Sequence, residues 1–140
     1  QKNAVHYLNK FAKLIRKILD ASRVKVVSLS DELDTMDLYM SIENIRFSNE
    51  IEYSEKVDES INLESIKVPP LILQPFLENA IWHGLRYKEE RGTLKININQ
   101  IDEETLSVSI EDDGVGRKRS QELKTNYNSR IQRLVLLFFV

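Results

Sequence analysis

Two short stretches of this chain of 140 residues combine side chains that could carry chemistry. Residues 73–84, LQPFLENAIWHG, suit a buried helix, yet four hydrogen-bonding side chains interrupt the apolar ones: Gln74, Glu78, Asn79 and His83. Residues 111–116, EDDGVG, place carboxylates directly before two closely spaced glycines. A core helix has no need of such polar groups for packing, so the pattern raises the possibility of a bound ligand.

Each stretch has a plainer interpretation when it is taken alone. An Asp-x-Gly-x-Gly run is usually an ordinary turn after a strand, and a lone buried asparagine often bonds only the backbone. Glu78 could pair with a neighbouring lysine, and His83 could bond the backbone near the helix end. The occurrence of both stretches in this order, with Asp112 33 positions after Asn79, is more specific than either alone.

The first half of the chain reads as two helices followed by a strand. Apolar residues at three-and-four spacing predict an amphipathic helix over residues 4–19. Ser28 or Ser30 could cap a second helix that runs to about Phe47. Residues 50–58, EIEYSEKVD, alternate loosely and predict a strand. Residues 68–70, Val-Pro-Pro, are a stop signal, because proline cannot donate a backbone hydrogen bond.

The second half reads as a helix followed by a hairpin. The helix is expected from about Leu71 to His83. Residues 93–101 and 106–112 alternate apolar and polar side chains on either side of an acidic turn, which predicts an antiparallel hairpin with one face on a core. Residues 117–124 read as a polar helix or loop. The coarse architecture is a helix pair at residues 1–48 that leads into an α+β layer.

Composition excludes several classes of protein. The 20 Lys+Arg against 22 Asp+Glu give a formal net charge of -2, whereas a general nucleic-acid binder would show a basic excess. The absence of cysteine excludes disulfides and thiolate metal sites and favours a reducing compartment. The two histidines are not spaced as a zinc-ligand pair. No apolar run approaches the roughly 20 residues of a membrane span, so we expect a soluble, intracellular chain or a cytosolic piece of a larger protein.

Residues 69–84, PPLILQPFLENAIWHG, preceded by residues 38–47, LYMSIENIRF, resemble the ATP-binding domain of sensor histidine kinases of the GHKL (Bergerat-fold) superfamily. The LytS-type group is the most similar, and the resemblance runs from about Tyr7 to Leu123. It implies an α+β fold, a Bergerat-type two-layer α/β sandwich in which a mixed or antiparallel sheet packs on helices, preceded by a helical segment. It also implies two domains, a helical segment over residues 1–48 from the C-terminal part of the dimerisation and phosphoacceptor region, and an ATP-binding domain over residues 49–140.

The resemblance gives the polar residues roles as ligands of ATP and Mg²⁺. Asn79 would hold Mg²⁺ through its amide oxygen, and Asp112 would accept a hydrogen bond from the adenine amine. Gly114 and Gly116 would let the backbone pass close to the base and enter a lid without a clash from a Cβ atom. The remaining predicted site residues, which line or brace the site or face the phosphates, are Gln74, Glu78, His83 and Lys88, with Arg86 or the basic run at residues 117–119 as alternatives to Lys88.

The chain departs from the pattern of the family at three positions in this region. Pro75 stands where ATP-hydrolysing members carry a glutamate, so hydrolysis would lack a general base. Trp82 stands where many LytS-type relatives have a lysine directed towards phosphate. Asp113 replaces a frequent asparagine and adds negative charge beside the predicted base pocket.

The two ends of the family pattern are also incomplete. No residue matches the phosphoacceptor motif, and His6 is not expected to be phosphorylated. The second glycine box is missing, because the glycines are at 84, 92, 114 and 116 alone. Residues 129–140 resemble the helix after that box and end on bare apolar side chains, so we expect a domain that is incomplete at its C-terminus. A lid over residues 121–129 is expected to be poorly packed without nucleotide, with residues 130–140 docking on the core through Ile131, Leu134 and Leu137.

The leading hypothesis is the ATP-binding catalytic domain of a two-component sensor histidine kinase. It would transfer the γ-phosphoryl group of ATP to a histidine outside these residues and from there to a response regulator, and these residues alone would not autophosphorylate. It would form a homodimer through its upstream helices and belong to the cytoplasmic portion of a membrane-anchored bacterial protein. One alternative is a catalytically degenerate dimerisation or regulatory module of the same fold. Another is a GHKL-type ATPase, which Pro75 and the balanced charge disfavour.

Overall fold

The computed structural model describes residues 2–46, 51–83, 85, 91–113 and 132–139. The chain forms two compact units that are interleaved in sequence. The first unit consists of residues 1–49 and 62–74, and the second of residues 50–61 and 75–140. The polypeptide therefore passes between the units three times.

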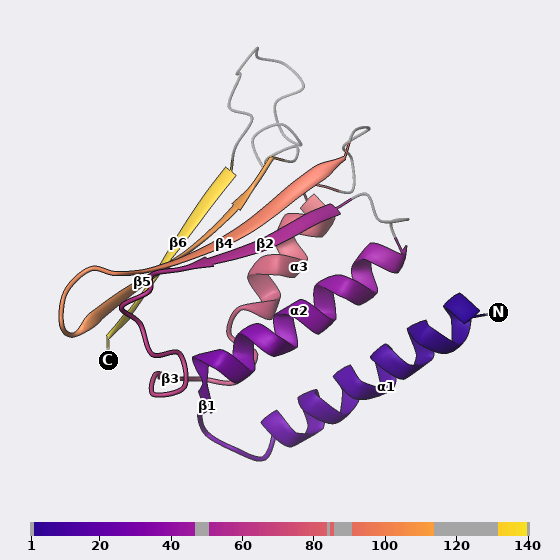
Figure 1. Ribbon diagram of the computed structural model, residues 1–140, viewed down its shortest axis with the longest axis horizontal. Helices are drawn as coiled ribbons and strands as arrows, with labels where there is room; N and C mark the ends of the chain where they lie inside the picture. The colour runs from indigo at the N-terminus through magenta and orange to yellow at the C-terminus, as the bar shows by residue number, and fades with distance from the viewer. Residues whose placement is uncertain (1, 47–50, 84, 86–90, 114–131, 140) are drawn as a thin grey trace, which may run out of the picture. The chain divides into compact units, whose positions relative to one another are not determined.

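The first unit is built on two packed helices, α1 (Lys2–Ala21) and α2 (Leu29–Arg46) (Figure 1). The helix predicted over residues 4–19 is confirmed and is slightly longer than expected. A short antiparallel ribbon of β1 (Val27–Ser28) and β3 (Lys67–Val68) ties the start of α2 to residues far along the chain. The buried apolar side chains of this unit include Leu14 on α1, Leu29, Leu33, Met36 and Met40 on α2, and Val68 on β3.

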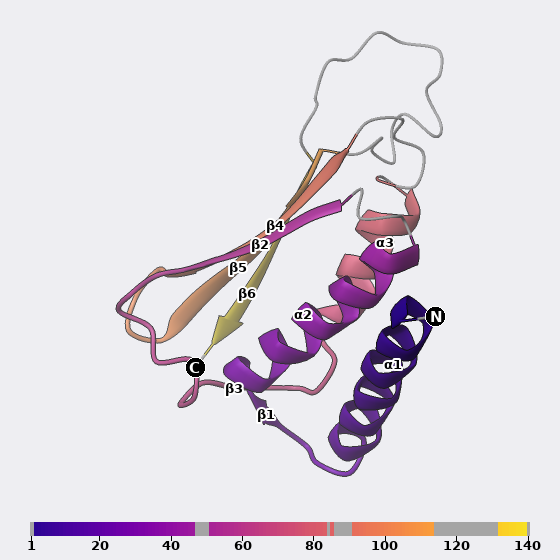
Figure 2. The same cartoon turned by 45° about the vertical axis from the view of Figure 1, so that its right-hand side comes forward.

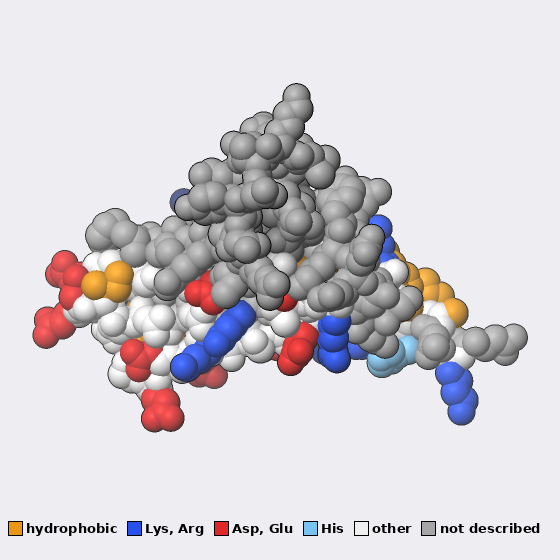
Figure 3. All heavy atoms as spheres, turned by 90° about the horizontal axis from the view of Figure 1, so that it is seen from above, with side chains coloured by type: hydrophobic (Ala, Val, Ile, Leu, Met, Phe, Trp, Pro, Cys, Tyr) orange, Lys and Arg blue, Asp and Glu red, His pale blue; other side chains and the backbone are white. Residues whose placement is uncertain are grey.

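The α1 helix is apolar on two sides. One side packs on α2 through Leu14. The other leaves large apolar side chains 40–60% exposed, namely Val5, Leu8, Phe11, Ile15 and Leu19. Figure 3 shows part of this uncovered apolar surface. Of the helices in the described residues, none combines the length and the apolar character that crossing a bilayer requires.

Ser28 determines where α2 begins. Its hydroxyl oxygen accepts a hydrogen bond from the backbone N–H of Asp31 at 3.0 Å, which is the geometry of an N-cap. The acidic residues Asp31 and Glu32 occupy the first turn, where they favour the positive end of the helix dipole. Of the two candidate caps, Ser28 rather than Ser30 is therefore the one used.

The second unit is a four-stranded sheet with one helix on it. The strands are β2 (Ile51–Val57), β4 (Gly92–Gln100), β5 (Thr105–Asp112) and β6 (Gln132–Phe139), in the order β2-β4-β5-β6. β2 runs parallel to β4, and the other neighbours are antiparallel, so the sheet is mixed. Helix α3 (Gln74–His83) lies on one face of this sheet (Figures 1 and 2). The predicted strand over residues 50–58 and the predicted hairpin are both confirmed.

The core of this unit follows from strand alternation. Cross-strand partners share a face of a sheet, and the register places Ile96 opposite Ile110 and Ile98 opposite Val108. All four side chains are at most 3% exposed. The predicted α+β architecture, a mixed sheet covered by helix, is confirmed.

The predictions for two segments need correction. Residues from Arg130 onwards were expected to resemble a helix, but Gln132–Phe139 forms a strand that pairs with β5 along its whole length. The run is dense in leucine, valine and phenylalanine, and a strand there satisfies backbone groups that β5 would otherwise leave unpaired. Helix α3 begins at Gln74 and not at about Leu71, because Leu71 has a left-handed backbone with φ of 60°.

Candidate functional site

Helix α3 separates an apolar stripe from its polar residues. Leu73, Leu77, Ala80 and Ile81, which the sequence predicts to face the sheet, recur at helical spacing and are all buried. Asn79 lies two positions from both Leu77 and Ile81, and at about 100° per residue it is on the opposite side of the helix. Asn79 is half-buried, and its neighbour Glu78 is exposed. The helix therefore buries one side and presents its polar side chains on the other.

Asp112 is the last residue of β5 and lies on the apolar face of the sheet. It pairs with Leu94 of β4, and it follows Val108 and Ile110 at the two-residue repeat of a strand. Its side chain is half-buried, whereas those of Leu94 and Ile110 are buried. Asp112 thus places a carboxylate at the rim of a hydrophobic surface, a position suited to recognising a flat apolar ligand with a polar edge.

The C-terminal end of α3 and Asp112 lie at the same end of the second unit. Leu85, two residues after α3, packs on Gly92 at the start of β4, and a Cβ atom at position 92 would lie 2.5 Å from Leu85 Cδ2. Asp112 pairs with Leu94, two residues further along β4. Figures 1 and 2 show the same proximity of these ends. The structure therefore brings together the two sequence motifs that were singled out for chemistry.

Asp113 has a different role from Asp112. Its carboxylate oxygen Oδ1 accepts a hydrogen bond from the backbone N–H of Thr93 at 2.8 Å, and its own N–H donates to the carbonyl of Thr93 at 3.3 Å. This reciprocal pair closes the open end of the β4–β5 hairpin. Of the two adjacent carboxylates, Asp113 is engaged with the backbone and Asp112 lies on the apolar face.

Glu32 of α2 is a buried carboxylate that the sequence predictions missed. It is 2% exposed, and it accepts hydrogen bonds from the backbone N–H groups of Leu71 at 2.9 Å and Leu73 at 3.1 Å. Burial raises its pKa above the ordinary value of 4.5, and the backbone donors partly oppose that rise. Its spacing of four from Met36 and eight from Met40 could have revealed it, since it is an acidic residue within the apolar stripe of α2.

The chain is similar to known histidine kinases. The family described as Histidine kinase matches residues 1–51. Sensor protein LytS of Oceanobacillus iheyensis is 35% identical over 113 residues, which make up 81% of this chain and 19% of that protein. The chain is therefore related to the LytS-type sensor histidine kinases. It spans less than half the length of the curated relatives that it matches.

Solved histidine kinases share the fold. The Acinetobacter baumannii histidine kinase AdeS aligns with a TM-score of 0.55 at 11% identity, covering 98% of this chain and 80% of that one. The histidine kinase ThkA, solved in complex with the response regulator protein TrrA, aligns with a TM-score of 0.52 at 14% identity, covering 96% of this chain and 48% of that one. At such identities these likenesses concern the fold alone.

Several predicted site residues lie outside the described part of this kinase-like chain. Lys88, Gly114 and Gly116 are among them, as are the predicted lid and the basic run at residues 117–119. His83 is the last residue of α3, but its side chain is not among those described. The roles of these residues, and those of Gln74, Glu78, Asn79 and Asp112, stay predictions. Among the described residues, no group of three or more His, Cys, Asp or Glu is arranged to hold a metal ion.

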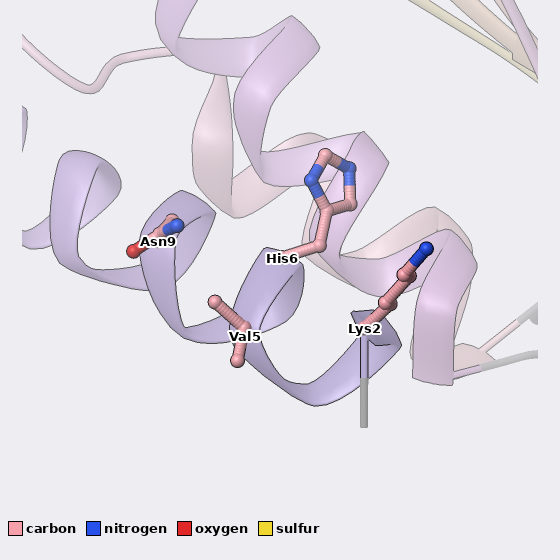
Figure 4. A pocket seen from close by; sticks show the side chains of 4 residues that line it. All are labelled: Lys2, Val5, His6 and Asn9. Atoms are coloured by element: carbon pink, nitrogen blue, oxygen red, sulfur yellow. The ribbon is translucent and has the colours of Figure 1, made fainter.

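His6 lies in a hollow of about 390 Å³ at the start of α1, lined by Lys2, Val5, His6 and Asn9 (Figure 4). All four residues belong to the first turns of one helix, and His6 is exposed. A hollow lined by a single helix offers few converging groups, whereas binding sites usually combine several elements. The geometry gives no added reason to place chemistry at His6.

Proposed function

We propose that this chain is the ATP-binding portion of a two-component sensor histidine kinase, with its nucleotide site between the polar side of α3 and the end of β5. The observation that carries the proposal is the meeting of α3 and Asp112 at one end of the second unit. The relationship to LytS supports the class of protein, and the two motifs support the ligand.

Asp112 is the proposed acceptor for the adenine amine. An ionised carboxylate can only accept hydrogen bonds, so it selects a ligand edge that donates. Its nearest apolar neighbours on the same face of the sheet, Leu94 and Ile110, are buried, so Asp112 lies at the edge of the core. A charge-assisted bond in a half-buried place is stronger than one that is fully exposed to water.

Asn79 is the proposed protein ligand of Mg²⁺. Magnesium takes hard oxygen ligands, keeps several waters, and is usually held by one or two protein groups together with substrate phosphates. An amide oxygen on the half-buried side of α3 meets this requirement without a cluster of acidic residues. The bound ion would neutralise the charge that develops on the γ-phosphoryl group during transfer.

The phosphoryl acceptor and the signalling partner lie beyond the described residues. We expect the acceptor to be a histidine outside this chain, from which a response regulator takes the phosphoryl group; the solved complex of ThkA with TrrA supports this type of partner. Because ATP is a cytoplasmic substrate, the chain would belong to the cytoplasmic portion of a membrane-anchored protein. The exposed apolar residues of α1 include Val5, Leu8, Ile15 and Leu19, which follow the three-and-four spacing of a helix-pairing seam and support a homodimer.

A catalytically degenerate module of the same fold is the second candidate. Trp82 in place of a phosphate-directed lysine, and the lack of a second glycine box among the four glycines of the chain, favour it. Such a module would dimerise through α1 but would bind nucleotide weakly or not at all. Nucleotide affinity therefore discriminates between the two candidates.

Titration calorimetry with ATP, with and without Mg²⁺, tests the proposed site. Asp112→Asn should weaken ATP and ADP alike by about 1–3 kcal/mol, the worth of one charge-assisted bond. Asp113→Asn is the matched control, because it makes the same chemical change one residue away and retains an oxygen for the bond to Thr93. Asn79→Ala should abolish mainly the Mg²⁺ dependence of the affinity.

Two results would contradict the proposal. Equal affinities for wild type, Asp112→Asn and Asn79→Ala would remove the site assignment. The absence of ATP binding by wild-type protein that is shown to be folded would favour the degenerate module.

A further inference from the structure

Glu32 joins two segments that are far apart in sequence. Its carboxylate lies on α2, and its two hydrogen-bond donors are 39 and 41 residues further along the chain. One oxygen, Oε2, accepts from Leu71, and the other, Oε1, accepts from Leu73. Both oxygens are therefore used to hold three consecutive residues of main chain, and those residues lead directly into α3.

Burying the carboxylate of Glu32 and straining the backbone of Leu71 both lower the stability of the folded state. A buried carboxylate loses its hydration, and a well-packed apolar residue in its place is often as stabilising or more so. Leu71 adds a second cost, because a branched side chain is strained at a φ of 60°. Two unfavourable features on the same short segment, next to a predicted ligand-binding helix, are typical of a functional constraint.

We propose that Glu32 is a positioning residue that fixes the main chain where it enters α3, the helix that carries the proposed Mg²⁺ ligand Asn79. Leu73 is bonded covalently to Gln74, the first residue of α3, and Asn79 lies five residues further on, about 7.5 Å along the helix axis. The backbone of residues 71–73 therefore determines where the first turn of α3 begins. This inference rests on the proposed nucleotide site.

The test compares Glu32→Gln with a matched control on the same helix. Glutamine has nearly the same shape, but one of its two terminal atoms is a donor that cannot accept from an N–H. Glu43→Gln is the control, since Glu43 is also buried on α2, and its carboxylate pairs with Arg46 at 3.1 Å. Both variants lose a buried charge, but only the first affects the bonds to Leu71 and Leu73.

Two measurements separate positioning from simple stability. Hydrogen exchange on the nucleotide-free protein should show the amides of Leu71, Leu73 and the first turn of α3 exchanging about tenfold faster in Glu32→Gln. Calorimetry at a temperature where all variants are folded should show affinity for Mg²⁺–ATP weakened about fivefold or more. Glu43→Gln should match wild type in both, whatever its melting temperature.

A second variant keeps the test decisive if the glutamine variant does not fold. Glu32→Asp retains the charge but withdraws the carboxylate by one methylene group, and it should give the same pattern at smaller amplitude. Unchanged affinity and unchanged exchange in α3 for the Glu32 variants would overturn the inference. Wild-type protein that binds no Mg²⁺–ATP would instead refute the proposed function, and the exchange of α3 would still decide whether Glu32 positions that helix.

Discussion

Replacement of Gly92 by alanine tests how α3 is fixed to the sheet. Gly92 is the first residue of β4, and it is covered by Leu85, which is itself buried. A Cβ atom at position 92 would come within 2.5 Å of Leu85 Cδ2. Carbon atoms normally approach no closer than about 3.5 Å, so one side chain must yield by about 1 Å.

The expected change in the free energy of unfolding is the difference between a cost of overpacking and a gain from the lower entropy of the unfolded chain. Overpacking of a buried site costs about 1–3 kcal/mol, and the loss of glycine's conformational freedom in the unfolded chain returns about 0.5–1 kcal/mol. Gly92→Ala should therefore lower the free energy of unfolding by up to about 2 kcal/mol. With Leu85 truncated to alanine the clash disappears, and the same substitution should become neutral or stabilising by about 0.5–1 kcal/mol.

Urea denaturation of the wild type, both single variants and the double variant measures this difference as a coupling energy. We expect about 1–3 kcal/mol of coupling between the two positions, because they are in direct contact. Leu85→Ala alone should cost about 2–5 kcal/mol, so the measurements need a temperature at which that variant is folded. An equal cost of Gly92→Ala with and without the Leu85 side chain would refute the reasoning, since the contact would then not be the obstacle.

Two further predictions concern α2. Ser28→Ala should lower the free energy of unfolding by about 1 kcal/mol, because it removes the acceptor for the Asp31 N–H. Ser30→Ala should change this free energy little. Thermal denaturation of both variants checks the prediction, and equal losses of stability would contradict the assignment of Ser28 as the cap. Burial raises the pKa of Glu32, so the folded state binds the proton of this carboxyl group more tightly than the unfolded state does. The contribution of this group to stability is therefore fully present below pH 4.5, and it is lost as the pH rises through the raised pKa of the folded state. The stability of wild type relative to Glu32→Gln should therefore fall from pH 4 towards neutrality, and a difference that is flat or rises with pH would show that burial does not dominate this carboxylate.

Local patterns were sufficient to predict the parts of the fold whose cause is local. Helix α1 follows from apolar spacing, and the β4–β5 hairpin follows from alternation around an acidic turn. The start of α3 could not be predicted in the same way. It depends on hydrogen bonds from Leu71 and Leu73 to Glu32, and no window of sequence around position 71 contains that acceptor.

The candidate site also combines features that local sequence predicts with features that depend on tertiary packing. The motif that contains Asn79 and the motif that contains Asp112 were visible in the sequence, but their meeting at one end of the unit depends on the packing of Leu85 on Gly92. The resemblance to the kinase family separated Asp112 from Asp113, but local pattern alone could not, because the pleat of β5 determines which of the two carboxylates lies on the apolar face. The last strand, β6, was expected to be a helix because residues 129–140 resemble the helix after the second glycine box, and a continuous apolar run has no period that distinguishes a helix from a strand.

The parallel pairing of β2 with β4 has a consequence for the order in which the chain folds. The β4–β5 hairpin joins strands separated by a short turn, so it can form early at a small loss of chain entropy. Ile51 pairs with Gly92 only after the long intervening segment, which includes α3, has been closed into a loop. We therefore expect β2 to dock late. Substitutions in the hairpin should slow folding, whereas substitutions on β2 should mainly accelerate unfolding.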